Sequence, residues 1–418
     1  MRHLVICNVG PINKVDIDLS RFNFFIGPQS CGKSTIAKVL STCMWLEKEA
    51  ATTLTEHLTY SSEEFVALIE DFHKIQGYFF DESTVDYETD AVVLHYDKKN
   101  ALTVELKEGF NYQRQKVSYI PAERSAITLP ELQGFEFGAS NMRSFLFDWF
   151  TARELYTSES KAEILNLDMR YFYNKDEKKY KDRVEHKNGR TYEISLSSAS
   201  SGLQALIPLQ LMMQYYTGEY FERYAVKSAF DDDEKDKLLR HRLTDKVVLE
   251  KLYHGYTESQ RGELVREVNQ KLREGEREYV ELLKEYKAVY NQLAVPKRTS
   301  FVVEEPEENL YPYSQIALLE LMVACCQNGR RHEMVVTTHS PYVVNYLNVL
   351  LRGSRNGVKV SPDEIGVWAV SDGGVLSLKA TDGTTGEVVI DTYDLTEPME
   401  SIFGEYRAME HYEDAIGK

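Results

Sequence analysis

The sequence predicts an α/β fold, in which a head with a mixed, mainly parallel sheet carries a helical hairpin insertion. Near the N-terminus, a compact apolar strand runs into a glycine loop and then a helix. Further along, two apolar strands are separated by a helix, and strands that alternate with helices are typical of parallel sheets. Between them lies a long proline-free stretch with helical periodicity. The expected domains are the head, residues 1–205 and 297–418, and the insertion, residues 206–296.

Composition and charge limit the classes of function. The chain has 418 residues, of which 43% are hydrophobic and 28% charged, as in ordinary globular proteins. A net charge of -17 makes the average field repel nucleic acid, so binding DNA would need a local basic groove. No window of 18 apolar residues and no signal peptide is recognisable. We therefore expect a cytoplasmic protein that does not enter a membrane.

The five cysteines are odd in number and show no repeated CxxC spacing. This pattern indicates neither a disulfide framework nor a zinc site.

The N-terminal half of the head is predicted from short apolar patterns. Alternating apolar residues after the turn at Gly10 and Pro11 predict two strands that form a hairpin-like edge. Phe22 to Ile26 reads as a buried strand, and a helix is expected from Lys33. Further elements expected before the insertion are a helix at 63–76, strands at 91–96, 101–106 and 117–120, and a charged hairpin near 171–195.

The insertion is predicted to contain two antiparallel helices, Lys235–Tyr253 and Glu258–Leu293. The second has apolar residues at spacings of three, four and seven, and Thr257 with Gln260 forms a possible capping box at its start. A projecting hairpin arm and a helical lid packed on the head explain this pattern equally well. After it, the expected elements are strands 300–303 and 334–337, helix 316–326, a helix after Pro341, and a hairpin of strands 365–370 and 375–380.

A phosphate-binding loop is the most specific motif. Residues 27–34 match G-x-x-x-x-G-K-[ST] and lie between a predicted strand and a predicted helix, as this motif requires. Backbone N–H groups of such a loop surround phosphate oxygens. Lys33 would place its charge on the β- and γ-phosphates, and the Ser34 hydroxyl would ligate Mg²⁺. The expected ATP-binding residues are Gly27, Pro28, Gln29, Ser30, Cys31, Gly32, Lys33, Ser34 and Thr35.

Two adjacent carboxylates, Glu304 and Glu305, end an apolar strand. Because side chains alternate along a strand, we expect Glu304 to face Mg²⁺ and Glu305 to orient or deprotonate the water that attacks the γ-phosphate. An isolated pair of this kind is more often solvated or starts a helix.

A histidine, His339, follows the next apolar strand and would donate to the γ-phosphate. By itself, a histidine at a strand end is usually structural or exposed.

A serine-rich turn opens the apolar helix Leu203–Tyr216. In isolation it is a helix cap. Beside a phosphate-binding loop, the same hydroxyls and free N–H groups suit a γ-phosphate that another subunit holds. The residues concerned are Ser200, Ser201 and Gly202.

These four motifs, in this order, resemble the ABC-type P-loop ATPase superfamily, most closely its soluble SMC, RecF and OLD-like branch. The resemblance covers the predicted head, and the run Glu304 to Pro312 is similar to the OLD-like variant. It implies an ABC-ATPase head that binds ATP and Mg²⁺ and hydrolyses ATP with Lys33, Glu305 and His339. It also implies a homodimer, or a higher even oligomer, in which Ser200, Ser201 and Gly202 act in trans and Asn309 lies near the D-loop.

The chain departs from the family pattern at three places. Glu304 stands where the family usually has aspartate, and Asn309 and Tyr311 stand where histidines are common. No Q-loop glutamine is evident; the stretch Tyr119 to Arg124 occupies its place, so Glu123 or Arg124 is the expected substitute. The helical insertion follows the serine-rich signature, whereas SMC-type arms precede it.

The resemblance further implies a partner. Too few residues follow the last motif for a Toprim nuclease domain, so we expect an ATPase that assembles with a separate nuclease or toxin, as in the anti-phage systems Septu and PARIS. An SMC/RecF-like repair ATPase that clamps DNA is the first alternative, and a non-hydrolysing ATP-dependent scaffold is another. A transporter motor is a third, but neither membrane helices nor a Q-loop supports it.

Overall fold

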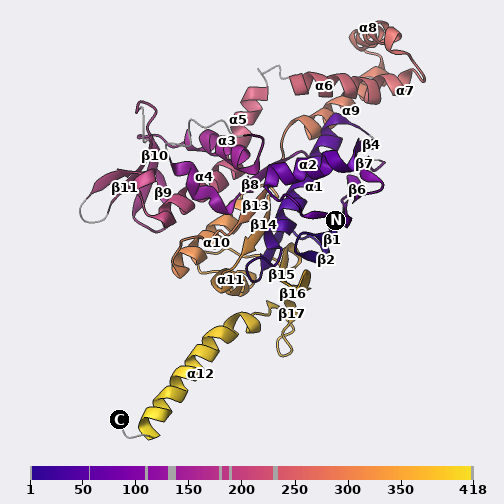
Figure 1. Ribbon diagram of the computed structural model, residues 1–418. Coiled ribbons are helices and arrows are strands. Elements are labelled where there is room, and N and C mark those ends of the chain that lie inside the picture. Colours follow the sequence, from indigo (N-terminus) through magenta and orange to yellow (C-terminus); the bar gives the residue numbers. More distant parts are fainter. Residues whose placement is uncertain are drawn as a thin grey trace.

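A six-stranded, mainly parallel sheet forms the centre of the molecule in the computed structural model (Figure 1). The structure describes residues 2–55, 57–108, 112–129, 138–177, 181–187, 191–228 and 234–415. In the sheet, β15, β3, β14, β13 and β8 run parallel, and β16 is an antiparallel edge, which confirms the predicted fold class. The strands are β3 (Phe22–Ile26), β8 (Gln115–Ile120), β13 (Arg298–Glu304), β14 (Glu333–Thr338), β15 (Ile365–Ser371) and β16 (Gly374–Ser377).

The central strands are apolar throughout because both faces of the sheet are covered. Phe24 joins the hydrophobic cluster on the side of α3, α4, α10 and α11, while its neighbour Phe25 joins the cluster around α1. The helices concerned are α1 (Lys33–Thr53), α3 (Asn141–Arg153), α4 (Ser201–Thr217), α10 (Pro312–Cys326) and α11 (Pro341–Arg352).

A second six-stranded sheet, antiparallel, lies over α1, with strand order β2-β1-β5-β6-β7-β4. It contains the predicted N-terminal hairpin, in which β1 pairs with β2. Capping-box bonds between Ser61 and Glu64 start the helix α2 beside it. The elements are β1 (His3–Val9), β2 (Ile12–Asp18), β4 (His57–Tyr60), β5 (Phe79–Glu88), β6 (Val92–Asp97), β7 (Ala101–Leu106) and α2 (Ser62–His73).

The charged region near 171–195 lies in a four-stranded antiparallel sheet of order β12-β11-β10-β9. Its buried pair Arg153 and Asp182, whose atoms Nη1 and Oδ2 are 2.8 Å apart, joins α3 to β11. The elements are β9 (Ala162–Ile164), β10 (Met169–Tyr173), β11 (Asp182–His186), β12 (Tyr192–Ser195) and the 3₁₀ turns η1 (Ala122–Thr128) and η3 (Leu196–Ser198).

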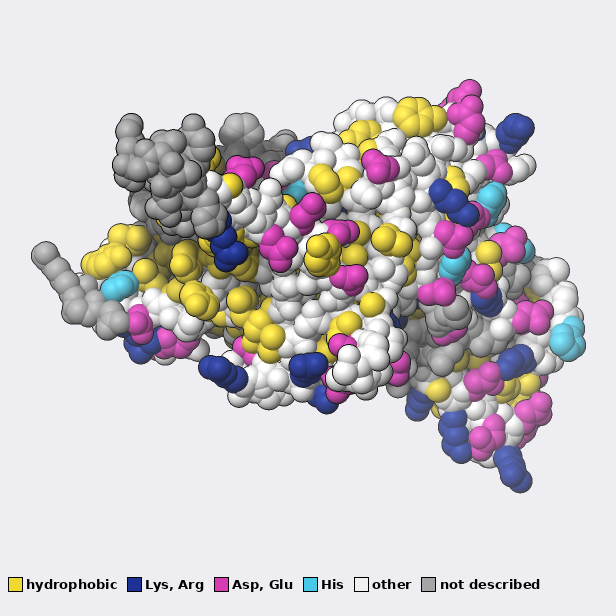
Figure 2. Space-filling view, turned by 90° about the horizontal axis from the view of Figure 1, so that it is seen from below, with side chains coloured by type: hydrophobic (Ala, Val, Ile, Leu, Met, Phe, Trp, Pro, Cys, Tyr) yellow, Lys and Arg dark blue, Asp and Glu magenta, His cyan; other side chains and the backbone are white. Residues whose placement is uncertain are grey.

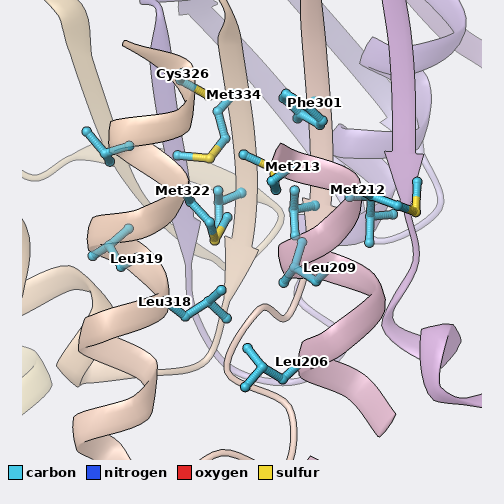
Figure 3. Packing of buried hydrophobic residues seen from close by; sticks show 14 of the residues in the cluster. Leu206, Leu209, Met212, Met213, Phe301, Leu318, Leu319, Met322, Cys326 and Met334 are labelled. Atoms are coloured by element: carbon cyan, nitrogen blue, oxygen red, sulfur yellow. The ribbon is translucent and has the colours of Figure 1, made fainter. Parts of the chain in front are cut away.

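Helix α4 belongs to the core of the head, so the predicted boundary at residue 206 falls inside it. Figure 3 shows Leu206, Leu209 and Met213 of α4 pointing toward α10, where Leu318 and Met322 face them. These side chains are 0–1% exposed. Full burial of an aliphatic side chain stabilises by about 1.5–3 kcal/mol, so α4 contributes strongly to the stability of the head.

The insertion differs from the prediction in two respects: an additional helix, α5, precedes the two predicted ones, and the second of those is interrupted. The second predicted helix, 258–293, is divided into α8 and α9, because Gly275 adopts a left-handed conformation with φ 75° and ends α8. Leu243 and Leu293 at its base join the cluster around α1, whereas α8 packs on a small cluster of its own. Its elements are α5 (Glu219–Ser228), α6 (Glu234–Leu243), η4 (Thr244–Leu249), α7 (Glu250–Leu252), α8 (Glu258–Glu274) and α9 (Arg277–Ala294).

The C-terminal part adds elements that the sequence analysis did not predict. A two-stranded ribbon, β17 (Lys379–Thr381) with β18 (Val388–Ile390), follows the 3₁₀ turn η5 (Pro362–Glu364) and β16. Helix α12 (Tyr393–Ala415) then extends away from the body (Figure 1). Within the described ranges, none of the helices combines the length and the apolar character that a membrane span requires.

Candidate functional site

The predicted phosphate-binding loop joins β3 to α1, and a glycine is required at its end. Gly32 has φ 107°, a left-handed conformation that L side chains rarely adopt. A Cβ atom at this position would lie 2.2 Å from Cδ1 of Ile12, which is too close for two carbon atoms. The turn therefore depends on glycine both for its backbone conformation and for the close approach of the β1–β2 hairpin.

The Lys33 side chain lies under this loop. Its ammonium donates to the carbonyl oxygens of Gly27 at 2.9 Å and Pro28 at 2.6 Å. It also lies 3.4 Å from Nδ1 of His339, a residue far from Lys33 in the sequence. Burial lowers the pKa of Lys33, while Cys31 and nearby carboxylates oppose this shift.

Register explains why the ends of β13 and β14 meet this loop. Glu304 is opposite Thr337 in one parallel pair, and Thr338 is opposite Ile26 in the next. The carboxyl ends of three adjacent strands therefore lie side by side at the start of α1.

Glu304 and Glu305 face different surroundings. The Glu304 residue is only 3% exposed, and burial raises the pKa of its carboxyl group, an effect that Lys38 and the Ser34 and Tyr119 hydroxyls oppose. Glu305 instead lines a cavity. Its backbone turns there with φ 44°, while its N–H donates to the Thr337 carbonyl at 2.8 Å. A left-handed conformation at a non-glycine residue is strained and is typical of functional sites.

His339 connects Lys33 with Glu305. Because an ammonium only donates hydrogen bonds, Nδ1 of His339 accepts from Lys33, and we assign the ring proton to Nε2. This Nε2 atom lies 3.4 Å from Oε1 of Glu305. The backbone N–H of His339 donates to Oε1 of Glu307 at 2.6 Å. The three side chains form one continuous polar chain.

These groups line a cavity of about 520 Å³. Part of the lining comes from residues that the sequence analysis did not single out, Gly77, Tyr78 and Phe80, and the two aromatic side chains form one wall. Gly10 fixes this wall, because its N–H donates to the Tyr78 carbonyl at 2.7 Å. The Gly10-Pro11 turn was the only sequence signal for it. The lining residues are Gly10, Pro11, Gln29, Ser30, Gly32, Lys33, Ser34, Thr35, Gly77, Tyr78, Phe80, Glu305 and His339.

The other predicted site residues lie outside this lining. The carbonyl oxygens of Gly27 and Pro28 accept hydrogen bonds from Lys33. The Sγ atom of Cys31 lies 3.7 Å from the Lys33 ammonium. Glu304 is buried behind the cavity wall.

The predicted signature residues are also outside the cavity. Ser200 and Ser201 are exposed at the start of α4. A Cβ atom on Gly202 would lie 2.7 Å from the carbonyl oxygen of Asn309, so the signature packs against the segment after Glu305. The serine turn and the segment around Asn309 thus form one surface.

Arg124 has a structural role that the sequence did not reveal. Its side chain is completely buried and is not part of the cavity lining. The guanidinium donates to the carbonyl oxygens of Glu304 and Glu305, both at 2.8 Å, and to that of Ala205 at 3.0 Å. Arg124 therefore ties the end of β13 to helix α4. A buried arginine inside a short 3₁₀ turn has no recognisable sequence pattern.

The donor set around Ser34 fits a magnesium ion. Oε1 of Glu304 is buried and has no hydrogen-bond partner among the described residues, and an unpaired buried carboxylate oxygen is costly. The Ser34 hydroxyl lies near this carboxylate and lowers its pKa. The described part of the chain contains no group of three or more His, Cys, Asp or Glu that could hold a metal by themselves. An ion here would need further oxygen ligands, such as phosphate and water.

Comparison with known proteins gives only distant likenesses. No family model and no curated protein matches the chain. Among solved structures, it is similar to the SMC head domain from Thermotoga maritima, with 10% identity and a TM-score of 0.37 over 91% of this chain and 100% of that one. It is also similar to an SMC head with an extended coiled coil, bound to the C-terminal domain of ScpA, from Pyrococcus furiosus, with 11% identity and a TM-score of 0.34 over 97% and 100%. A third is the recombination mediator protein RecF, with 10% identity and a TM-score of 0.30 over 90% and 97%.

Proposed function

We propose that this chain is an ATP-binding and ATP-hydrolysing head that works as a head-to-tail pair. The observation that supports it most directly is the meeting of Lys33, Glu305 and His339 at one cavity whose floor is a phosphate-binding loop. A cavity of about 520 Å³ is within the usual size of small-molecule sites.

Binding is explained by the loop and the aromatic wall. The N-terminus of α1 and the loop N–H groups favour phosphate oxygens, and Lys33 adds a positive charge. Tyr78 and Phe80, on the other wall, offer flat apolar surface for the adenine ring. Ser34 and Glu304 are the residues that would hold Mg²⁺, which neutralises charge on the β- and γ-phosphates when bound.

Hydrolysis is assigned to Glu305 and His339. Glu305 orients the attacking water and accepts its proton, while the water oxygen bonds to the γ-phosphorus and the bond to the bridging oxygen breaks. The Nε2–H group of His339 lies 3.4 Å from Oε1 of Glu305, and with ATP bound this single donor would be shared between the Glu305 carboxylate and a γ-phosphate oxygen. Lys33 then stabilises the negative charge that develops on the phosphate oxygens.

Pairing is supported by the position of the signature. Ser200 and Ser201 are exposed and do not line the cavity of their own chain. Because Gly202 packs on Asn309, the signature and the segment after Glu305 present one continuous surface. A second copy, placed head to tail, would bring this surface to the γ-phosphate.

The proposal that the pair controls a separate nuclease or toxin in anti-phage defence rests on the sequence resemblance to OLD-like ATPases. The alternative of DNA clamping requires a basic groove. On the face shown in Figure 2, lysine and arginine side chains are interspersed with acidic ones, and the net charge is -17. The alternative of a non-hydrolysing scaffold differs from an ATPase only in turnover.

The decisive experiment combines turnover with oligomeric state. The unsubstituted chain should release phosphate from ATP, whereas Glu305→Gln should bind ATP but lose about 100-fold or more of the rate, because the carboxylate base is gone. Light scattering after gel filtration should show that ATP keeps Glu305→Gln paired. Glu63→Gln, an exposed position on α2, is the matched control. Full activity of Glu305→Gln would refute the assignment, and no turnover by the unsubstituted chain would favour the scaffold.

A further inference from the structure

A second cavity, of about 330 Å³, lies between α1, α2, α3 and β8 and shares no lining residue with the first. Four aromatic side chains contribute to its walls: Trp45, Phe72, His73 and Tyr119. Its volume is near the lower limit of ligand sites in proteins, which is the size for a small ring system and too small for a nucleotide.

The aromatic rings are arranged in contact with each other. The ring centroids of Phe72 and His73 are 4.9 Å apart with planes at 85°, and those of His73 and Tyr119 are 5.1 Å apart at 55°. Trp45 is 36% exposed, at the edge of the cavity. Aromatic walls of this kind favour a planar apolar occupant, because ring pairs gain energy from edge-to-face and offset contacts beyond simple burial.

His73 is a lining residue whose hydrogen bonding is incomplete. The Ser41 hydroxyl donates its only hydrogen to the Lys38 carbonyl at 2.9 Å, so its oxygen accepts from Nε2 of His73 at 3.1 Å. The ring proton is therefore on Nε2, and Nδ1 is an acceptor. Burial and the charge of Lys38 lower the pKa of His73 to about 3, so the ring is neutral.

Nδ1 of His73 has no partner among the described residues, although the residue is only 2% exposed. A buried acceptor that stays unpaired costs about 1–3 kcal/mol, so a donor that reaches it would bind favourably. We propose that this cavity is a second ligand site, which takes a small planar aromatic molecule whose N–H or O–H group donates to Nδ1 of His73.

The site is connected to the nucleotide cavity by two elements. The ring of Tyr119 contacts His73, and its hydroxyl lies beside Glu304; burial, together with the charge of Glu304, raises the pKa of this tyrosine. Helix α1 carries Lys33 at its start and Trp45 further along. A ligand in this cavity would therefore affect the position of Glu304, a consequence that rests on the proposed function.

Indole is a suitable probe, because it is planar and small and carries one N–H donor. Its matched control, 1-methylindole, keeps the ring and lacks the donor. In ligand-observed NMR titrations of the full chain, indole should bind saturably and about tenfold more tightly than 1-methylindole. Ser144→Trp should abolish indole binding by filling the cavity from its rim, and Ser144→Ala should leave it unchanged.

Two results would overturn the proposal: equal affinities for indole and 1-methylindole, or unchanged indole binding by a folded Ser144→Trp protein. The titration needs no nucleotide. Loss of ATP binding in the same preparation would therefore count against the proposed function and not against this site.

Discussion

The ammonium group of Lys33 and the imidazole ring of His339 lie 3.4 Å apart, although 306 positions separate the two residues. The same ring reaches Glu305 through its other nitrogen atom at 3.4 Å. A residue of the proposed phosphate-binding loop is thus linked to the proposed base by one histidine, and substitution of that histidine tests the arrangement directly.

His339→Ala should lower the rate of ATP hydrolysis about 100-fold while ATP affinity changes only a few-fold, because the loop and Lys33 remain. Phosphate release and fluorescent-nucleotide titration measure the two quantities. His57→Ala, at an exposed position on β4, should have no effect. A parallel loss of affinity and rate would assign His339 to binding instead.

Gly32→Ala should abolish ATP binding and lower the melting temperature, since the new Cβ atom would lie 2.2 Å from Ile12 in a left-handed turn. Gly275→Ala is the control for backbone strain alone, because Gly275 has φ 75° and no neighbour within 4 Å of a Cβ atom. It should destabilise by about 1 kcal/mol and leave ATP binding intact. ATP binding by Gly32→Ala at normal affinity would contradict the assignment of this loop.

Arg124→Lys should destabilise the protein by about 3 kcal/mol in urea unfolding, because a lysine cannot replace the bonds to Glu304, Glu305 and Ala205 together. Hydrolysis should also fall, since the backbone that carries Glu305 loses its support. Arg143→Lys on the exposed surface of α3 should be neutral within about 0.5 kcal/mol. Unchanged stability and activity of Arg124→Lys would show that these bonds do not position the site.

Tyr78→Ala should raise the Kd for ATP about tenfold by removing an aromatic surface for the base. Tyr78→Phe keeps the ring and should bind ATP as the unsubstituted chain does. Inorganic triphosphate, which has no adenine base, should bind both variants with equal affinity. This result would assign the loss in Tyr78→Ala to the contact with the adenine ring.

Stability should fall as the pH is lowered, with a contribution from His73. The pKa of His73 in the folded chain is about 3, below the ordinary value of 6.5, so the unfolded state binds a proton that the native state excludes. The free energy of unfolding therefore falls as the pH drops below 6.5, and it continues to fall until about pH 3. At pH 5 the loss due to His73 is about 2 kcal/mol.

Urea unfolding of the unsubstituted chain and of His73→Gln at pH 7.5 and pH 5 measures this contribution. The variant should lose about 2 kcal/mol less than the unsubstituted chain between the two pH values. His332, whose pKa is also lowered, to about 4, is present in both proteins and cancels in the comparison. Equal losses would mean that His73 takes up its proton in the folded state.

The sequence by itself determined the elements whose cause is local. The motif of the proposed phosphate-binding loop is contiguous, and the conformation of Gly32 follows from backbone sterics of neighbouring residues. The buried strands β3, β13 and β14 were predicted from apolar runs. The break at Gly275 also has a local cause, a glycine that ends a helix. It was not predicted because the apolar spacing continues across this position.

Only the tertiary structure decided which distant residues meet. Hydrophobic periodicity says that one face of α4 is buried, but not that α10 and the sheet cover it. The inward direction of Arg124, the aromatic wall of Tyr78 and the unpaired nitrogen of His73 likewise depend on neighbours from other parts of the chain. The physical reason is that backbone conformation is set largely by adjacent residues. Burial and side-chain hydrogen bonding instead depend on residues far apart in the sequence, which come into contact only when the chain folds.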